Sequence, residues 1–199
     1  MRRGAVAVMR CGRRKVAHRK IPAEIERVFL DEETIAAQVR RLAARISEDY
    51  AEIDDVVLVG VLKGAFIFLS DLARDLTIPH AVDFIALSSY NKGVVNTGAV
   101  RFIMDTRGSV TGRNVLVVED ILDTGYTLDY LLRAFQARNP ASLRTCVFIS
   151  KPDRHQVEVP IDYLGFETPD EWLVGYGLDY ADRFRTLPYI GILKREVYE

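Results

Sequence analysis

Cysteine and histidine, the side chains that build disulfide frameworks and zinc sites, are scarce in this chain. It has two cysteines, Cys11 and Cys146, which lie far apart without a CxxC spacing, and three scattered histidines. A disulfide framework and a zinc site are therefore excluded as organising features. Cys146 lies in the apolar run 145–149, and we expect it to be a small hydrophobic residue of the core.

Long apolar runs are also missing. No segment approaches the roughly 18 consecutive apolar residues of a membrane span. Residues 1–20 lack the apolar stretch of a secretory signal. These absences argue against a membrane protein and predict a cytoplasmic location.

Net charge is close to zero, at −1, so the chain as a whole has no electrostatic preference for nucleic acid or an anionic membrane. The first 20 residues are the exception, because they contain eight Lys or Arg residues and no acidic residue. We interpret residues 1–24 as a basic, poorly ordered N-terminal extension. The alternative is a basic arm that binds nucleic acid.

The remaining residues, 25–199, are predicted to form one domain, since 49% of the chain is hydrophobic and its length is short for two domains. Apolar runs without alternation are typical of strands buried on both faces of a parallel sheet, and they occur at 56–61, 114–118 and 143–149. Helical patterns are found at 31–50, where Asp31 can cap the first turn, and at 64–76 and 127–138. This succession predicts an α/β fold with a central parallel sheet flanked by helices.

Two further regions complete the predicted layout. Residues 82–87 and 100–104 suit two strands joined by a long polar stretch, which predicts a flexible hairpin loop. From Pro160 onward, short apolar runs suit short strands that close over one edge. In parallel sheets, ligands bind beyond the carboxyl ends of the strands. The segments expected to converge there are 61–64, 119–127 and 150–151.

The turn Thr124-Gly125-Tyr126-Thr127 follows a buried strand and opens a helix. Its free backbone amides, the positive end of the helix dipole and two hydroxyl groups together form a predicted phosphate cradle. Neither GxxxxGK[ST] nor GxGxxG is present, which disfavours a nucleoside triphosphate or NAD. Glu119 and Asp120 directly precede this turn, and buried carboxylates need hydroxyl, amide or metal partners.

Residues 117–127, VVEDILDTGYT, resemble the phosphoribosyl pyrophosphate signature of type I phosphoribosyltransferases. Other motifs resemble, in order and approximate spacing, the hypoxanthine-guanine phosphoribosyltransferases. They are Leu62-Lys63-Gly64, Ser89-Tyr90, Lys151-Pro152, and residues 171–180 followed by Arg185. The resemblance covers about residues 25–195. It implies the type I phosphoribosyltransferase fold, with a small hood from N- and C-terminal segments and a flexible hairpin loop.

The resemblance also implies roles for the sugar-binding residues. Glu119 and Asp120 face the ribose hydroxyls, while the 5′-phosphate lies on Thr124, Gly125, Tyr126 and Thr127. Magnesium bridges pyrophosphate and ribose oxygens, and its implied protein ligands are Glu119, Asp120 and Asp179. Asp123 lies beside purine N7, where we expect it to act as the general acid/base.

The remaining implied roles concern the base and the leaving group. Lys151 offers donors to the O6 carbonyl of a 6-oxopurine, and Trp172 stacks on the ring. Backbone carbonyls near Leu173 and Asp179 accept from the guanine amino group. Pyrophosphate lies on Lys63, Gly64 and Arg185, next to a cis Leu62–Lys63 bond. Ser89 and Tyr90 close over the site as a lid.

The resemblance implies purine salvage, in which phosphoribosyl is transferred to N9 of hypoxanthine or guanine to give IMP or GMP and pyrophosphate. It also implies a homodimer or a homotetramer. Two alternatives stay open: a nucleic-acid-binding regulator that senses the sugar donor, and a phosphoribosyltransferase that prefers xanthine. Because Asp123 and Lys151 are present, the enzyme is favoured, and nucleic acid is an unlikely partner.

Overall fold

The computed structural model describes residues 20–89 and 100–199. In chain order the elements are β1 (Ile25–Leu30), α1 (Glu32–Asp49), β2 (Val56–Leu62), α2 (Phe66–Asp75), β3 (His80–Ser89), β4 (Val100–Met104), β5 (Asn114–Leu122), α3 (Tyr126–Gln136), β6 (Ser142–Ser150), β7 (Tyr163–Glu167), β8 (Leu173–Val174) and β9 (Ile190–Leu193), with 3-10 turns at Pro152–Arg154 and Arg195–Val197.

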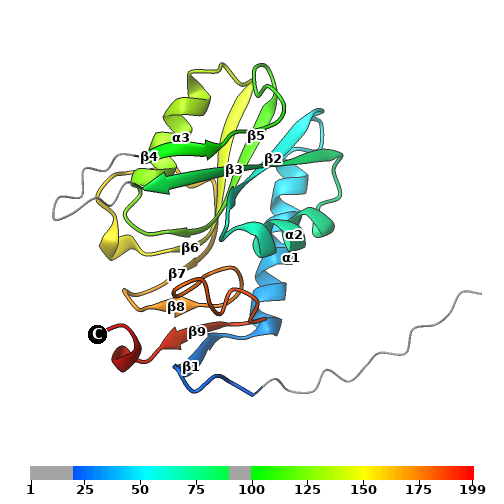
Figure 1. Cartoon of the computed structure of the whole chain (residues 1–199). Coiled ribbons are helices and arrows are strands. Elements are labelled where there is room, and N and C mark those ends of the chain that lie inside the picture. The colour runs from blue at the N-terminus through cyan, green and yellow to red at the C-terminus, as the bar shows by residue number, and fades with distance from the viewer. Residues whose placement is uncertain (1–19, 90–99) are drawn as a thin grey trace, which may run out of the picture.

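The main sheet has six strands in the order β4-β3-β2-β5-β6-β7. Neighbouring strands are parallel except β3 and β4, which form an antiparallel pair. Helices α1 and α2 lie on one face of this sheet and α3 on the other (Figure 1). The predicted α/β fold with a central, mostly parallel sheet is confirmed.

The two faces of the sheet explain why its strands lack polar alternation. On β2, Val56 and Leu58 belong to the core that includes α1 and α2. Val57 and Val59 belong to the second core, under α3. Side chains alternate between faces along a strand, so a strand covered on both faces is apolar at every position. Cys146 is fully buried in the first core, and this burial raises the pKa of its thiol.

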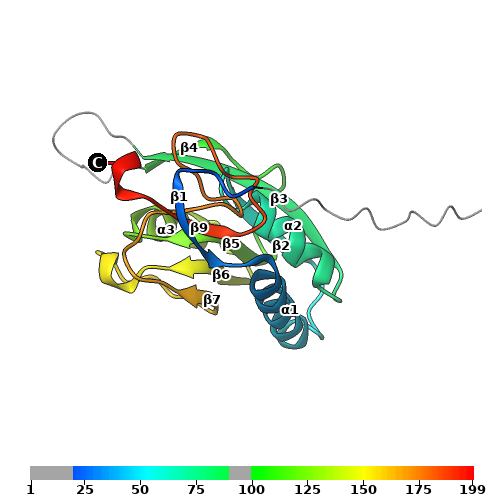
Figure 2. The same cartoon turned by 90° about the horizontal axis from the view of Figure 1, so that it is seen from below.

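A second, smaller sheet joins the two ends of the domain. Its strands are antiparallel in the order β1-β9-β8, and it lies beyond one end of the main sheet (Figures 1 and 2). Residues from both termini thus form the hood that the family resemblance implies. Glu24, just before β1, is held by an ion pair of 2.9 Å with Arg183.

The strands after Pro160 divide between the two sheets. Short strands closing over one edge were expected in this part of the chain; β8 and β9 belong to the smaller sheet, whereas β7 extends the main sheet in parallel with β6. Tyr163 explains the pairing, because it is buried and its hydroxyl donates to Asp49 on α1 at 2.7 Å. Arg144 donates to the same hydroxyl at 2.8 Å. Tyr163 therefore anchors β7 between β6 and α1.

The start of α1 follows the predicted cap. The Asp31 carboxylate accepts a hydrogen bond of 2.8 Å from the Thr34 amide. Hydrogen bonding from the side chain of Thr34, and from its amide, lowers the pKa of Asp31. Most of the expected basic extension, residues 1–19, lies outside the described residues. None of the helices in the described ranges is long and apolar enough to cross a membrane.

Candidate active site

The acidic pair Glu119 and Asp120 lies inside β5. The strand was expected to end near residue 118, but its pairing with β6 continues to Leu122. Both carboxylates are consequently buried, with relative exposures of 7% and 9%. Burial raises the pKa of Glu119, and the adjacent Asp120 raises it further. Burial likewise raises the pKa of Asp120.

Two glycines allow other segments to approach these carboxylates closely. A Cβ atom at Gly64 would overlap the Asp120 carboxylate, and one at Gly177 would overlap the backbone carbonyl of Gly64. Gly177 also has a φ of +104°, which favours glycine. The loop after β2, the end of β5 and the loop after β8 therefore meet in one place. The Leu62–Lys63 peptide bond beside them is cis.

The segment predicted to hold a phosphate has the expected form of a strand, a turn and a helix. Gly125 has a φ of +91° and precedes Tyr126, the first residue of α3. A Cβ at position 125 would lie 2.8 Å from Val157 and 2.9 Å from its carbonyl oxygen. The Thr124 carbonyl accepts hydrogen bonds from the amides of Gln156 and Val157 at 3.0 and 3.4 Å. The segment after β6 thus supports the cradle from behind, while the amides of the first turn of α3 lack partners within the helix.

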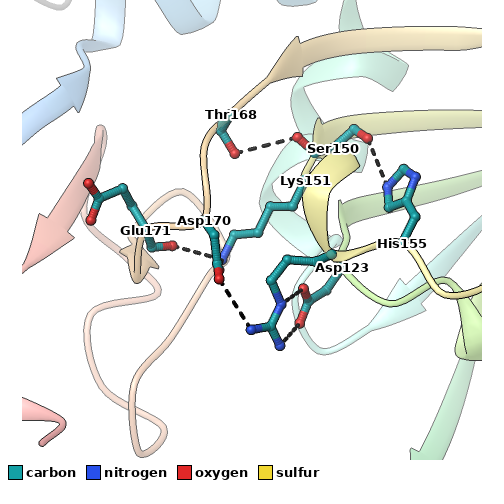
Figure 3. A network of polar contacts seen from close by, with 8 residues as sticks. Asp123, Ser150, Lys151, His155, Thr168, Asp170 and Glu171 are labelled. Carbon is teal, nitrogen blue, oxygen red and sulfur yellow. Dashed lines mark hydrogen bonds and ion pairs between the residues drawn. The ribbon is translucent and has the colours of Figure 1, made fainter.

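Asp123 has a cationic partner that sequence reasoning missed. Arg154 Nε lies 2.7 Å from Asp123 Oδ1, and Arg154 Nη2 lies 3.4 Å from Oδ2. The same guanidinium contacts Asp170 Oδ2 at 3.4 Å. Asp123 raises the pKa of Arg154. Figure 3 shows this network beside Lys151.

Lys151 points toward the same network from the end of β6. Its ammonium donates to the Glu171 carbonyl at 2.7 Å and lies 3.7 Å from Asp170 Oδ1 (Figure 3). The residue is 9% exposed, so its position is fixed and its charge is held near the protein interior. Three donors are available on an ammonium group. One is used by the Glu171 carbonyl, which leaves donors for a ligand.

A cavity of about 480 Å³ brings most of the predicted base-binding residues together. Trp172 is exposed by 44%. Its ring stacks on Tyr198 with a centroid distance of 5.0 Å and an interplanar angle of 25°. Sequence reasoning missed Tyr198 and Ile121. The cavity is lined by Asp120, Ile121, Asp123, Lys151, Arg154, Asp170, Glu171, Trp172, Leu173, Leu178, Asp179 and Tyr198.

The predicted pyrophosphate residues lie in a separate group of charges. Lys63 Nζ lies 2.9 Å from Asp182 Oδ1. Arg185 Nη2 lies 2.7 Å from Asp179 Oδ1 and 3.3 Å from Asp182 Oδ1. Arg185 Nη1 also donates to the Gly177 carbonyl at 2.9 Å. Asp182 was not identified from the sequence, because an acidic residue in an exposed turn is usually a solvated charge.

The acidic side chains supply only some of the ligands that a magnesium ion needs. Asp120 and Asp179 line the same cavity, whereas Glu119 does not. Within residues 20–89 and 100–199, no three His, Cys, Asp or Glu side chains gather into a metal site. Mg²⁺ commonly binds one or two carboxylates and completes its shell with water and substrate phosphates. The carboxylates of Asp120 and Asp179 therefore fit a magnesium ion that binds together with phosphoribosyl pyrophosphate, whose oxygens complete the coordination shell.

The predicted lid falls at the edge of the described structure. Ser89 is the last residue of β3, and Tyr90 lies outside the described residues. The roles assigned to both residues stay predictions.

Comparison with known proteins places this geometry in a family. Residues 28–181 match the model of the phosphoribosyl transferase domain. The hypoxanthine-guanine phosphoribosyltransferase of Dictyostelium discoideum is 42% identical over 86% of this chain and 97% of its own length. The hypoxanthine phosphoribosyltransferase of Haemophilus influenzae is 45% identical over 82% and 93%.

A solved structure of the hypoxanthine phosphoribosyl transferase of Trypanosoma cruzi is similar to this one, with a TM-score of 0.85 and 39% identity. The match covers 90% of this chain and 97% of that one. That structure comes from work on how the C-terminal region affects oligomeric state and enzymatic activity. From the domain match, the sequence identities and the shared fold, this chain belongs to the hypoxanthine-guanine phosphoribosyltransferase family.

Proposed function

We propose that this protein transfers 5-phosphoribosyl from phosphoribosyl pyrophosphate to N9 of hypoxanthine or guanine, giving IMP or GMP and pyrophosphate. The observation that carries this proposal is the arrangement at the end of β5. Buried carboxylates Glu119 and Asp120 precede a phosphate cradle on the same strand and helix, and Asp123 and Lys151 face one cavity beside them. The reaction belongs to purine salvage.

In this proposal the sugar donor spans two charge environments. Its 5′-phosphate binds the amides and hydroxyls of residues 124–127 at the start of α3. Its ribose hydroxyls donate to Glu119 and Asp120, which removes the conflict between these carboxylates and a phosphate. Both carboxylates also favour the positive charge that develops at the anomeric carbon as the pyrophosphate bond breaks.

Asp123 acts as the general base. As purine N9 forms its bond to the anomeric carbon and pyrophosphate leaves, the proton on N7 passes to the Asp123 carboxylate. Arg154 is a positioning residue, since its guanidinium contacts both Asp123 oxygens and limits the rotation of the side chain. Asp123 must therefore give up part of its contact with Arg154 when it accepts the N7 proton.

Magnesium would be held by Asp120 and Asp179, which line the same cavity, and would neutralise charge on the pyrophosphate. Lys63, Gly64 and Arg185 receive the same leaving group. Binding of the metal depends on the oxygens of the sugar donor, because the described side chains alone form no closed site.

Lys151 determines which purine the enzyme accepts. Its ammonium offers only donors, which suit the O6 carbonyl of a 6-oxopurine and oppose the 6-amino group of adenine. Trp172 stacks on the purine ring, and carbonyls near Leu173 and Asp179 accept from the guanine amino group. Hypoxanthine, guanine and xanthine share the O6 carbonyl, so a preference for xanthine stays the nearer alternative.

The wider setting is proposed on similar grounds. A homodimer or a homotetramer is expected from the family, and we propose a cytoplasmic location. A regulator that senses the sugar donor and binds nucleic acid is disfavoured, because such a protein does not need Asp123 and Lys151 together on a base-sized cavity.

The proposal is tested by steady-state rates with Mg²⁺, the sugar donor and each of hypoxanthine, guanine, xanthine and adenine. We expect turnover with hypoxanthine and guanine, and a loss of about 10² to 10⁴ in kcat for Asp123→Asn. Asp105→Asn is the matched control, because Asp105 also pairs with an arginine, Arg138, at 2.7 Å but lies outside the cavity. Equal kcat values for wild type and Asp123→Asn would remove Asp123 from the mechanism.

A further inference from the structure

The two cations expected to receive pyrophosphate share one carboxylate oxygen. Lys63 comes from the loop after β2, and Arg185 comes from the loop before β9. Both side chains contact Oδ1 of Asp182, at 2.9 Å for Lys63 Nζ and 3.3 Å for Arg185 Nη2. The Asp182 oxygen lies between two cations from separate segments, which is the position that one phosphate oxygen would occupy.

The turn that carries Asp182 holds its carboxylate in this place. The Asp182 amide donates to Asp179 Oδ2 at 2.8 Å, and Asp179 in turn contacts Arg185 at 2.7 Å. Asp182 has a φ of +58°, so its backbone conformation is one that the turn imposes. The hydrogen bonds from Lys63 and Arg185 lower the pKa of Asp182, and the group carries its negative charge at neutral pH.

We propose that Asp182 is a built-in competitor for the pyrophosphate site. In the empty enzyme its carboxylate occupies the anion position between Lys63 and Arg185 and keeps both cations oriented. Pyrophosphate, free or as part of the sugar donor, must displace the carboxylate to reach them. This inference rests on the proposed function, because it assumes that these two cations receive the leaving group.

The exposure of the group explains why the competition is mild. The side chains of Lys63 and Asp182 are 68% and 69% exposed, and ion pairs exposed to water are weak. A pyrophosphate carries several charges and is assisted by a metal ion, so it displaces the carboxylate. When pyrophosphate leaves as product, Asp182 pairs again with Lys63 and Arg185 and so weakens their binding of pyrophosphate. Asp182 therefore modulates the binding and release of pyrophosphate and does not touch the reacting atoms.

The test is Asp182→Asn, which keeps the size of the side chain and removes its charge. Calorimetric titration with pyrophosphate and Mg²⁺ at low ionic strength is expected to show binding about two- to fivefold tighter than in wild type. Product inhibition by pyrophosphate should strengthen by the same factor, and KM for the sugar donor should fall. KM for the purine should not change, because Asp182 does not line the cavity.

Two variants act as controls. Asp182→Glu keeps the charge and should restore binding close to that of wild type. Asp55→Asn removes an aspartate of similar exposure, which pairs with Arg113 at 2.6 Å just before β2, at the opposite end of the strand from Lys63; its affinity for pyrophosphate should equal that of wild type. A general effect of net charge would instead tighten binding in Asp55→Asn as well, and would overturn the inference.

The outcomes also separate this inference from the proposed function. A wild-type protein that transfers phosphoribosyl, together with unchanged pyrophosphate affinity in Asp182→Asn, would overturn the role of Asp182 alone. A wild-type protein that binds no pyrophosphate would overturn both.

Discussion

Asp123 and Lys151 are tied together by Asp170, which contacts both Arg154 and Lys151. The guanidinium of Arg154 then reaches Asp123 at 2.7 Å. The proposed general base and the ammonium proposed to select the purine are thereby held in one network, although they lie on different loops (Figure 3). Such networks orient polar side chains before a ligand arrives, which lowers the cost of ordering them on binding.

The proposed contact of Lys151 with purine O6 can be tested by substituting this one residue. Lys151→Met keeps much of the length and apolar stem but removes the donors to O6. A hydrogen bond to a charged group is worth about 1.5 to 3 kcal/mol, so kcat/KM for hypoxanthine should fall by about ten- to a hundredfold. Adenine should remain a poor substrate, because the variant gains no acceptor for its amino group.

The control for this variant is Lys194→Met, since Lys194 lies after β9 and does not line the cavity. Its rates should match those of wild type. A Lys151→Met protein with an unchanged rate for hypoxanthine would show that another group recognises O6.

The site residues that could be predicted from the sequence differ in their local surroundings from those that could not. Glu119, Asp120, Asp123 and Lys151 come soon after apolar runs of the sequence, where a charged side chain is unexpected and therefore informative. Their function in this chain stays a prediction until it is measured. Arg154 and Asp182 stand in exposed turns, where charges are common, and only their distances to other groups single them out.

Among the structural elements, the loop between β2 and α2 depends on the absence of a side chain at Gly64. A Cβ there would overlap the Asp120 carboxylate. Because Asp120 is buried in a central strand and cannot move freely, Gly64→Ala should displace the loop that carries Lys63. We expect affinity for the sugar donor to fall more than tenfold while the circular dichroism spectrum stays that of the folded protein.

Gly108→Ala is the benign counterpart, since the nearest atom to a Cβ at Gly108 is 3.8 Å away on Arg113. This variant should bind the sugar donor like wild type. Normal affinity in Gly64→Ala would mean that the close approach of loop and strand is unimportant for the site.

The C-terminal turn Arg195–Val197 ends at Tyr198, which stacks on Trp172. Offset aromatic pairs contribute about 0.5 to 1.5 kcal/mol beyond their buried area. Tyr198→Ala should therefore loosen Trp172 and raise KM for the purine by about two- to tenfold, with KM for the sugar donor unchanged. Tyr198→Phe keeps the ring and should behave as wild type; a purine KM in Tyr198→Ala equal to that of wild type would contradict the role of this stack.

The elements show where local sequence patterns are sufficient. The helix from Glu32 was predicted closely, because Asp31 caps it and its apolar stripe has helical spacing. The length of β5 was underestimated, since two acidic residues look like the end of a strand. In the fold they continue it, because β6 supplies pairing partners as far as Ser150. The position of β7 also depended on a distant contact, the bond of Tyr163 to Asp49.

At the scale of the whole molecule, the site forms where the carboxyl ends of the parallel strands meet the smaller sheet of β1, β9 and β8. The main sheet supplies the cradle, the carboxylates and Lys151, while the segment around β8 supplies Trp172 and Asp179. This division could be foreseen, because ligands in parallel sheets bind beyond the carboxyl ends of the strands. The pairing of β1 with β9 joins the two ends of the domain and has no local sequence signal; only the family resemblance implied it, as a hood from N- and C-terminal segments.

In the proposed complex, acidic side chains hold the sugar's hydroxyl groups while the amides at the start of α3 hold its phosphate. A crystal structure of the protein with IMP would show both sets of contacts. We expect the phosphate within hydrogen-bonding distance of the amides of residues 125–127 and the ribose hydroxyls at Glu119 and Asp120. A phosphate bound elsewhere, with the turn at Gly125 empty, would contradict this arrangement.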